Sequence, residues 1–303
     1  MSSLAVNIAG VQLKNPLIAA SGTFGYGREY EALYPLSVWG GISLKGMTLA
    51  KRMGNPPPRV AETPLGLLNS VGLQNPGVDY FLEHELPNLR TKATVLIANV
   101  AGSTLEDYRG ICERLDGQVD MIELNISCPN VKEGGAAFGT SCESAAGVVR
   151  IVRPVLKKTP LMVKLTPNVT DIASVAQAVE SEGADAVSLI NTILGMRINI
   201  ATRRPILKNN VGGLSGPAVF PVALRMVWQV ANRVHIPVVG LGGISTWQDA
   251  VEMMLAGACA VQVGSAMFSD AYAPVKIAQG LQKYLDDNGI RDINSIVGQV
   301  KPW

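Results

Sequence analysis

The chain has 303 residues, 48% of them hydrophobic, and this size fits either two ordinary domains or one α/β barrel. Its 26 Lys and Arg residues nearly balance its 24 Asp and Glu residues, and the sequence has no basic block of the kind that follows a phosphate backbone. We therefore expect no nucleic-acid partner.

The cysteines, Cys112, Cys128, Cys142 and Cys259, are scattered and form no C-x-x-C pair, so the usual spacing of zinc or iron–sulfur ligands is absent. The start MSSLAVNIAG has no basic segment leading into an apolar stretch with a cleavage site. No uncharged apolar stretch is long enough to cross a bilayer. We expect a soluble cytoplasmic protein with reduced thiols and no membrane partner.

Short apolar runs in chain order predict eight strands. They occupy residues 16–22, 40–46, 95–100, 120–128, 161–167, 186–192, 236–243 and 260–267. These runs are nearly continuous in hydrophobicity rather than alternating, which is typical of parallel strands covered on both faces. Helix signals lie between them, including capping boxes at Ser103 with Glu106 and at Ser245 with Gln248. The pattern predicts a (β/α)8 TIM barrel.

Segments outside this repeat have predicted places around the barrel. Residues 4–15 alternate well enough for a short N-terminal β-hairpin that closes the bottom of the barrel. Residues 47–69 and 193–217 form long βα loops, and loops of this length usually cover a site or are disordered. No interdomain linker is evident, so residues 1–303 are expected to form a single domain.

The predicted C-terminal ends of the strands are polar and rich in glycine. In a barrel of this kind, the chemistry takes place at these ends. The residues there are Ser21, Lys45, Asn99, Asn125, Cys128, Lys164, Asn191, Thr192, Gly242, Gly243, Gly264 and Ser265. The last two strand ends, GLGGIST and VGSAM, favour a phosphate site, because glycines bring backbone N–H groups close to an anion and a helix N-terminus adds partial positive charge. The alternative is that these glycines only make tight turns.

Lys45 and Lys164 each follow an apolar strand. A lysine directed into a dry site must pair with an anion or lose its proton. Lys45 fits a phosphate or an electron-rich ring, and Lys164 would also suit a Schiff base. The alternative for both is a side chain that reaches the rim. Asparagines at 69, 99, 125 and 191 suit amides and carboxylates, although any one of them could be a turn residue.

Cys128 has unusual neighbours for a thiol. A cysteine beside a strand is more often a small buried apolar residue. Here Asn125 precedes it, and Pro129, Asn130 and a glycine-rich stretch follow it, which indicates a loop able to present the thiol. The two histidines lie away from the predicted strand C-termini, so we expect neither a histidine base nor a metal site, and the thiol is the candidate base.

The assembled motifs resemble the class 1 dihydroorotate dehydrogenases, flavin enzymes of pyrimidine synthesis. They appear in the expected order as ASGTFGYG, SLKGMT, NSVGLQNPG, ELNISCPN, VKLTPN, LINT, GGLSGPA, GLGGI and VGSAMF. The cysteine at 128 is similar to the base of class 1 members, where class 2 members carry serine. The continuation CPNVKEGGAAFG resembles the catalytic subunit of subclass 1B.

The resemblance implies FMN as cofactor and assigns residues to it and to the substrate. The FMN contacts it implies are Ser21, Lys45, Gly46, Asn99, Asn125, Lys164, Ile190, Gly216, Gly242, Gly243, Gly264 and Ser265. The implied contacts to dihydroorotate are Lys45, Asn69, Ser70, Val71, Gly72, Leu73, Asn125, Asn191 and Thr192. The whole chain would then be a single FMN-binding barrel.

The implied reaction is oxidation of (S)-dihydroorotate to orotate in de novo pyrimidine (UMP) biosynthesis. Cys128 would take a proton from C5 while hydride leaves C6 for flavin N5, and Lys164 would stabilise the negative charge on the reduced flavin. A chain without a G-x-G-x-x-G motif after its first strand lacks a dinucleotide fingerprint of its own.

The implied assembly is a heterotetramer in which a homodimer of this chain binds two iron–sulfur flavoprotein subunits. Those subunits would carry FAD and a 2Fe–2S cluster and pass electrons to NAD+. Three alternatives stay open: a subclass 1A homodimer that uses fumarate, a Schiff-base lyase that uses Lys164, and a non-catalytic scaffold subunit.

Overall fold

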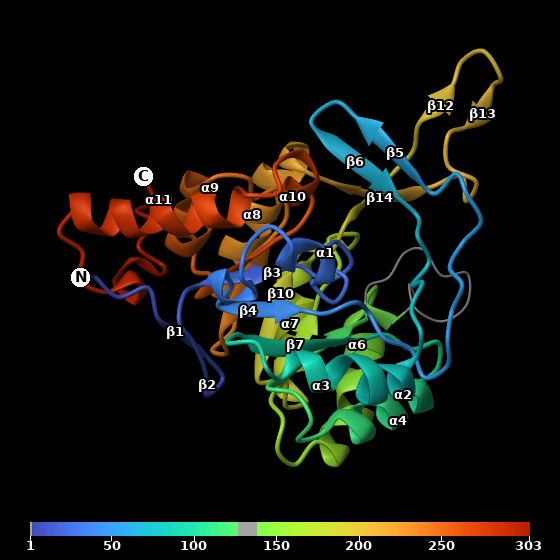
Figure 1. Ribbon diagram of the computed structural model, residues 1–303, viewed down its shortest axis with the longest axis horizontal. Helices are drawn as coiled ribbons and strands as arrows, with labels where there is room; N and C mark the ends of the chain where they lie inside the picture. The colour runs from blue at the N-terminus through green and yellow to red at the C-terminus, as the bar shows by residue number, and fades with distance from the viewer. Residues whose placement is uncertain (1, 127–137) are drawn as a thin grey trace.

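The computed structural model describes residues 2–126 and 138–303. Eight parallel strands close into a barrel at its centre (Figure 1). In order around the barrel they are β3 (Leu17–Ala19), β4 (Gly41–Ser43), β7 (Val95–Val100), β8 (Met121–Asn125), β9 (Leu161–Lys164), β10 (Ala186–Leu189), β15 (Val238–Leu241) and β16 (Ala260–Val263). Each lies within one of the eight predicted runs, so the (β/α)8 prediction is confirmed.

Helices connect these strands and cover the outside of the barrel. The longer ones are α4 (Leu105–Leu115), α6 (Cys142–Val152), α7 (Ile172–Ser181), α8 (Phe220–Ala231), α9 (Trp247–Leu255) and α11 (Ala273–Asp287). The shorter helices are α1 (Arg28–Glu31), α2 (Val78–Tyr80), α3 (Leu86–Leu89) and α10 (Ala266–Ser269). The described residues also form single 3₁₀ turns and a π-helical segment: η1 (Leu36–Val38), η2 (Phe81–Glu85), η3 (Arg153–Val155), η4 (Pro217–Val219) and η5 (Ile293–Ile296).

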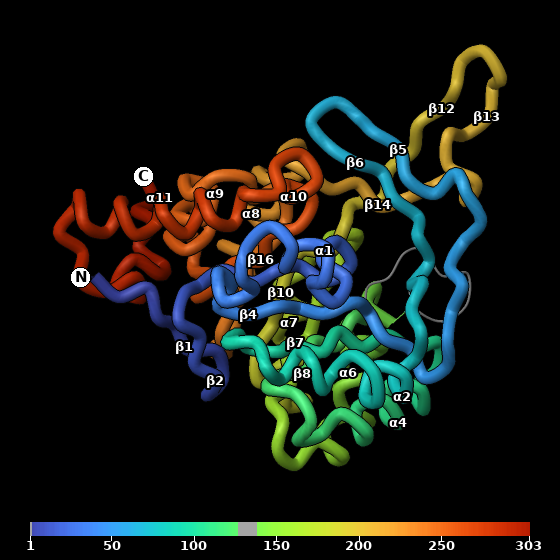
Figure 2. The backbone as a smooth tube through the Cα atoms, in the orientation of Figure 1, coloured from blue at the N-terminus to red at the C-terminus, as the bar shows by residue number. Residues whose placement is uncertain are grey.

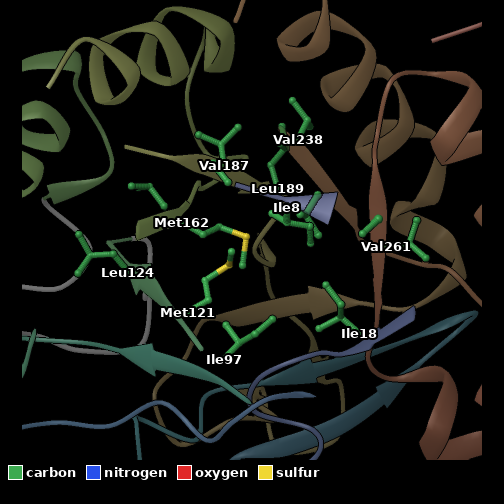
Figure 3. Close-up of a cluster of buried hydrophobic side chains, with 14 of the residues drawn as sticks. Ile8, Ile18, Ile97, Met121, Leu124, Met162, Val187, Leu189, Val238 and Val261 are labelled. Carbon is green, nitrogen blue, oxygen red and sulfur yellow. The ribbon is translucent and has the colours of Figure 1, made fainter. Parts of the chain in front are cut away.

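The barrel strands are buried on both faces, as their continuous apolar runs require. Every residue of β8, β9, β10, β15 and β16 is buried. Figure 3 shows how side chains from neighbouring strands, among them Met121, Met162 and Val261, gather in one apolar cluster. This packing fixes the strands, and it thereby fixes the direction of the side chains at their ends.

Two capping boxes are present, each one residue later than predicted. Thr104, not Ser103, caps α4 and pairs with Asp107, while Thr246, not Ser245, caps α9 and pairs with Asp249. The prediction was wrong because Ser and Thr stand side by side in both places. The aspartate three residues after each threonine determines which residue is the cap. Its carboxylate accepts hydrogen bonds from the backbone N–H groups of the threonine and of the serine before it.

The predicted N-terminal hairpin is present. Strands β1 (Val6–Ile8) and β2 (Val11–Leu13) pair antiparallel just before β3. Ile8 is fully buried and lies in the apolar cluster of Figure 3. The two chain ends lie on the same side of the molecule (Figure 2), where the Ser2 hydroxyl donates to the Asp286 carboxylate at 2.6 Å.

The two long βα loops contain strands of their own and pair with each other. Strands β5 (Val60–Thr63) and β6 (Gly66–Asn69) come from the first, and β11 (Ile193–Gly195) and β14 (Gly212–Ser215) from the second. They form a four-stranded antiparallel sheet in the order β11, β14, β6, β5, beside a small hairpin of β12 (Ile198–Asn199) and β13 (Arg204–Pro205). This sheet and the hairpin project from one side of the barrel (Figure 1).

Candidate active site

A cavity of about 420 Å³ lies at the C-terminal ends of the barrel strands. Each barrel strand, or the segment directly after it, contributes lining residues, and the antiparallel sheet adds Val60, Leu67 and Leu214. The volume is within the usual range for a small-molecule or cofactor site. Both long loops therefore lie against the cavity, as their predicted position over the site requires.

Nearly all of the predicted cofactor residues line this cavity. They are Ser21, Lys45, Gly46, Asn99, Asn125, Lys164, Ile190, Gly242, Gly243, Gly264 and Ser265. Gly216 does not line it but lies directly behind the glycines, because a Cβ built on Gly243 would stand 2.8 Å from the Gly216 carbonyl oxygen.

The predicted substrate residues line the same cavity, with one exception. The lining residues are Lys45, Asn69, Val71, Gly72, Leu73, Asn125, Asn191 and Thr192. Ser70 is fully buried, and its hydroxyl has no hydrogen-bond partner within the part of the chain that the structure describes. Cys128, the predicted base, lies outside the described residues.

A buried carboxylate beneath the cavity, Glu123 on β8, was not predicted. It is fully buried and accepts four hydrogen bonds from side chains on four other strands. The donors and distances are the Ser43 hydroxyl at 2.7 Å, the Asn99 amide at 2.7 Å, the Ser188 hydroxyl at 2.8 Å and the Gln262 amide at 2.6 Å. The signal was in the sequence, because a carboxylate inside the apolar run MIELN requires buried partners.

Lys164 stands on β9 beside this carboxylate. Its ammonium nitrogen lies 3.9 Å from Glu123 Oε2, and only 4% of the residue is exposed. Burial opposes ionisation of Glu123, but the charge of Lys164 and the hydrogen bonds from Ser43, Gln262 and Ser188 outweigh it, so the pKa of Glu123 lies below its ordinary value of 4.5. The two groups thus form a buried ion pair at the floor of the cavity.

Three asparagines form a hydrogen-bonded chain from this floor to the edge of the cavity. Asn125 Nδ2 donates to Asn99 Oδ1 at 3.4 Å, and Asn191 Nδ2 donates to Asn125 Oδ1 at 3.2 Å. The Tyr108 hydroxyl donates to the Asn125 carbonyl oxygen at 2.9 Å and anchors the end of β8. The amides predicted separately from the sequence therefore act as one array.

The glycines after β15 have conformations that other residues rarely adopt. Gly242 has φ +121° and Gly243 has φ +80°. A Cβ on Gly243 would also come within 2.8 Å of the backbone nitrogen of Phe220. The chain passes close to its own backbone here, which requires glycine at Gly243 for both reasons.

Cys112, Cys259 and the two histidines lie away from the cavity. Cys112 is buried in α4, where burial raises the pKa of its thiol, and burial raises the pKa of Cys259 to about 12. His84 and His235 are exposed and do not line the cavity. Within residues 2–126 and 138–303, no group of three or more His, Cys, Asp and Glu side chains could hold a metal ion. In the same ranges, the helices are too short or too polar to cross a membrane.

Comparison with known proteins agrees with the resemblance seen in the motifs. The sequence model of the family described as dihydroorotate dehydrogenase matches residues 3–285. The chain is 55% identical over 303 residues to the "Dihydroorotate dehydrogenase B (NAD(+)), catalytic subunit" of Phocaeicola vulgatus, covering 99% of this chain and 100% of the relative.

Relatives from two other organisms carry the same printed name. The protein from Desulforamulus reducens is 54% identical over 298 residues, covering 98% of each chain. The protein from Thermoanaerobacter pseudethanolicus is 52% identical over 300 residues, covering 99% of each chain. The chain belongs to the dihydroorotate dehydrogenase family.

Proposed function

We propose that this chain is the FMN-binding catalytic subunit of a dihydroorotate dehydrogenase of the NAD+-dependent B type, which oxidises (S)-dihydroorotate to orotate in pyrimidine biosynthesis. The observation that carries the proposal is the cavity, which gathers two lysines, four asparagines and the glycine-rich ends of β15 and β16 from strands far apart in the sequence. The family of the chain and the names of its relatives support the same reaction.

The strand ends fit FMN in shape and chemistry. Gly243 and Gly264 bring bare backbone to the cavity, as a bound phosphate requires. The N-terminus of α9 is less suited to the phosphate, because Asp249 already accepts the N–H groups of Ser245 and Thr246. The Oε1 atom of Gln262 is buried with no partner among the described residues, so the floor retains an acceptor for a donor on the ligand.

Each group of residues has a distinct role in this proposal. FMN, when bound, supplies the acceptor of the substrate hydride. Lys164 holds positive charge at the floor, where negative charge develops during the reaction. Lys45, Asn69, Asn191 and Thr192 bind and orient the carboxylate and imide of the substrate.

Cys128 is the proposed base that takes the C5 proton. It follows the last residue of β8, Asn125, by three positions in the sequence. A free thiol has a pKa near ~8.5, so the base requires modest activation or an alkaline medium.

Electrons leave this chain through a partner in our proposal. The sequence has no G-x-G-x-x-G motif after its first strand, and the relatives are named as catalytic subunits of NAD+-dependent enzymes. We therefore propose a cytoplasmic heterotetramer in which a homodimer of this single-domain chain binds two subunits with FAD and a 2Fe–2S cluster.

The arrangement is unfavourable for the alternative Schiff-base lyase. A Schiff-base lysine must present its amine to the substrate carbonyl, and the Lys164 amine is paired with the Glu123 carboxylate at 3.9 Å.

The test is to purify the chain alone and assay orotate formation with an artificial electron acceptor and with NAD+. A yellow protein with FMN that forms orotate rapidly with the artificial acceptor and slowly with NAD+ would support the proposal. A colourless protein that borohydride traps on a lysine would overturn it, and rapid direct reduction of NAD+ would overturn the role of the partner.

A further inference from the structure

Glu123 holds polar side chains from several barrel strands together beneath the cavity. An ionised carboxylate only accepts hydrogen bonds, so every group that contacts it must present a donor. Its four donors come from β4, β7, β10 and β16, and its ionic partner comes from β9. One side chain thus fixes polar groups on five strands of the barrel.

The carboxylate sets the direction of the asparagine chain. Asn99 must turn its Nδ2 atom toward Glu123, which leaves its Oδ1 atom to accept from Asn125. Asn125 then presents its own Oδ1 atom to Asn191. The orientation of each amide follows from the one before it, and the chain ends at a residue assigned to the substrate.

Gln262 must also turn a donor toward Glu123, because an ionised carboxylate only accepts hydrogen bonds. Its Nε2 atom donates to Glu123 at 2.6 Å, so its Oε1 atom is left without a partner among the described residues. Gln262 lines the cavity and is 1% exposed. A buried acceptor without a partner is costly unless a ligand supplies the donor, so this amide is held ready for one.

Few charges surround the ion pair. Among the described residues of the barrel strands, Glu123 and Lys164 are the buried charged side chains, and half-buried Lys45 follows β4 at the edge of the cavity. The negative charge of Glu123 therefore offsets the positive charge of Lys164 in a region with little water.

We propose that Glu123 is a positioning residue for this reaction: it holds and partly neutralises Lys164 at the floor of the cavity where FMN would bind, and it fixes the direction of the amides that would bind the substrate. The inference rests on the proposed function, because it assigns FMN and orotate to this cavity. It adds a residue that acts through Lys164, Asn99 and Gln262 on both ligands.

The first test measures the midpoint potential of the bound flavin. Glu123→Gln keeps the shape and removes the charge, so reduced flavin is favoured and the potential moves upward. Lys164→Gln leaves the carboxylate without its cation, and the potential moves downward. In the double variant Glu123→Gln/Lys164→Gln, the potential lies above that of Lys164→Gln alone.

The second test measures orotate binding through the flavin spectrum. A glutamine at 123 has an N–H donor where the site requires acceptors, so the amide chain loses its fixed direction. We expect the dissociation constant of orotate to rise about tenfold in Glu123→Gln.

The matched control is Glu85→Gln. Glu85 is also a buried carboxylate, 6% exposed, but it pairs with Arg28 and does not line the cavity. This variant should keep both the flavin potential and the orotate affinity of the wild type. If Glu123→Gln does not fold, Lys164→Gln is compared with the double variant. These two proteins differ only by Glu123→Gln, so the flavin potential of the double variant should again be the higher one.

The outcomes separate this inference from the proposed function. A wild-type protein without FMN or orotate binding would overturn both. A wild-type protein that binds both, together with Glu123 variants whose potential and orotate affinity match those of Glu85→Gln, would overturn the role of Glu123 alone.

Discussion

The two ends of the barrel are built from different kinds of residue. At the C-terminal end, the strands finish in lysines, asparagines and glycines around a cavity. At the N-terminal end, the β1–β2 hairpin buries Ile8 and Leu13, and carboxylates accept backbone N–H groups at the strand starts, as Asp185 does from Leu161 at 2.7 Å. The polar groups at the C-terminal end line the cavity, and those at the N-terminal end hold the fold together.

This difference makes the ends separable by mutation. Changes to polar side chains at the C-terminal end should remove flavin chemistry at little cost in stability, whereas changes to the packing at the N-terminal end should lower stability and leave the chemistry intact.

The largest expected effect is that of Cys128→Ala. Loss of the base should slow flavin reduction by dihydroorotate about 10²- to 10⁴-fold, since a general base contributes a factor of this size. FMN and orotate binding should persist, and Cys128→Ser should regain part of the rate at high pH. Stopped-flow absorbance measures the rate, and a near-normal rate in Cys128→Ala would refute the assignment of the base.

The matching change at the other end is Ile8→Ala. Ile8 is fully buried, so truncation should lower the free energy of unfolding by about 2–4 kcal/mol. Denaturant unfolding measures this loss. The rate of flavin reduction should equal that of the wild type, and a large fall in the rate of the folded variant would contradict the separation of the two ends.

Two glycine variants test the same difference between the two ends of the barrel. Gly243 and Gly10 both have positive φ, at +80° and +89°, but a Cβ meets backbone atoms at 2.8 Å in Gly243 and nothing within 4 Å in Gly10. Both alanine variants should lose about 1–2 kcal/mol of stability from the strained backbone conformation, and Gly243→Ala should lose more because its Cβ would also meet backbone atoms. Gly243→Ala should in addition lose at least about tenfold in FMN affinity, which fluorescence titration of the apoprotein measures. Equal FMN affinity in the two variants would count against a phosphate site at Gly243.

The smallest expected effect concerns Asp116, at the N-terminal end. Burial opposes its ionisation, but hydrogen bonds from the backbone N–H groups of Lys158, Thr159 and Lys157 outweigh it, so its pKa lies below the ordinary 3.8. A carboxyl with a lowered pKa stabilises the fold fully above its unfolded value and loses that contribution as pH falls through the folded value.

The stability difference between wild type and Asp116→Asn should therefore be constant near neutral pH and shrink below about pH 4. Because the side chain is partly exposed, we expect no more than about 1 kcal/mol after solvent screening. Thermal unfolding against pH measures the difference. A difference that grows as pH falls would contradict the sign.

The sequence predicted the barrel because its strands lie in nearly continuous apolar runs that recur between helix signals, and it predicted most of the cavity because residues at the C-terminal ends of such strands must converge. The strands of the long loops were not predicted. They are two to four residues long and contain glycines such as Gly66 and Gly213, so no periodic pattern marks them. Pairing between segments far apart in the chain, as in Gly213 with Asn69, determines them.

The hydrogen-bond partners of Glu123 could not be predicted from the sequence either. Its isolated charge in an apolar run was a signal. Its partners Ser43, Ser188 and Gln262, however, precede the polar residues predicted at the strand ends, so the rule that selected those residues did not select them. Only the closed barrel shows that these side chains point to one centre.

In the proposed reaction, hydride passes from dihydroorotate to FMN bound at the C-terminal end of the barrel. The most direct measurement is the visible spectrum of the purified chain, kept anaerobic, before and after addition of dihydroorotate or NADH. We expect dihydroorotate to bleach the flavin rapidly and NADH to bleach it slowly in the absence of a partner subunit. A flavin spectrum that dihydroorotate leaves unchanged would show that the cavity does not carry out this transfer.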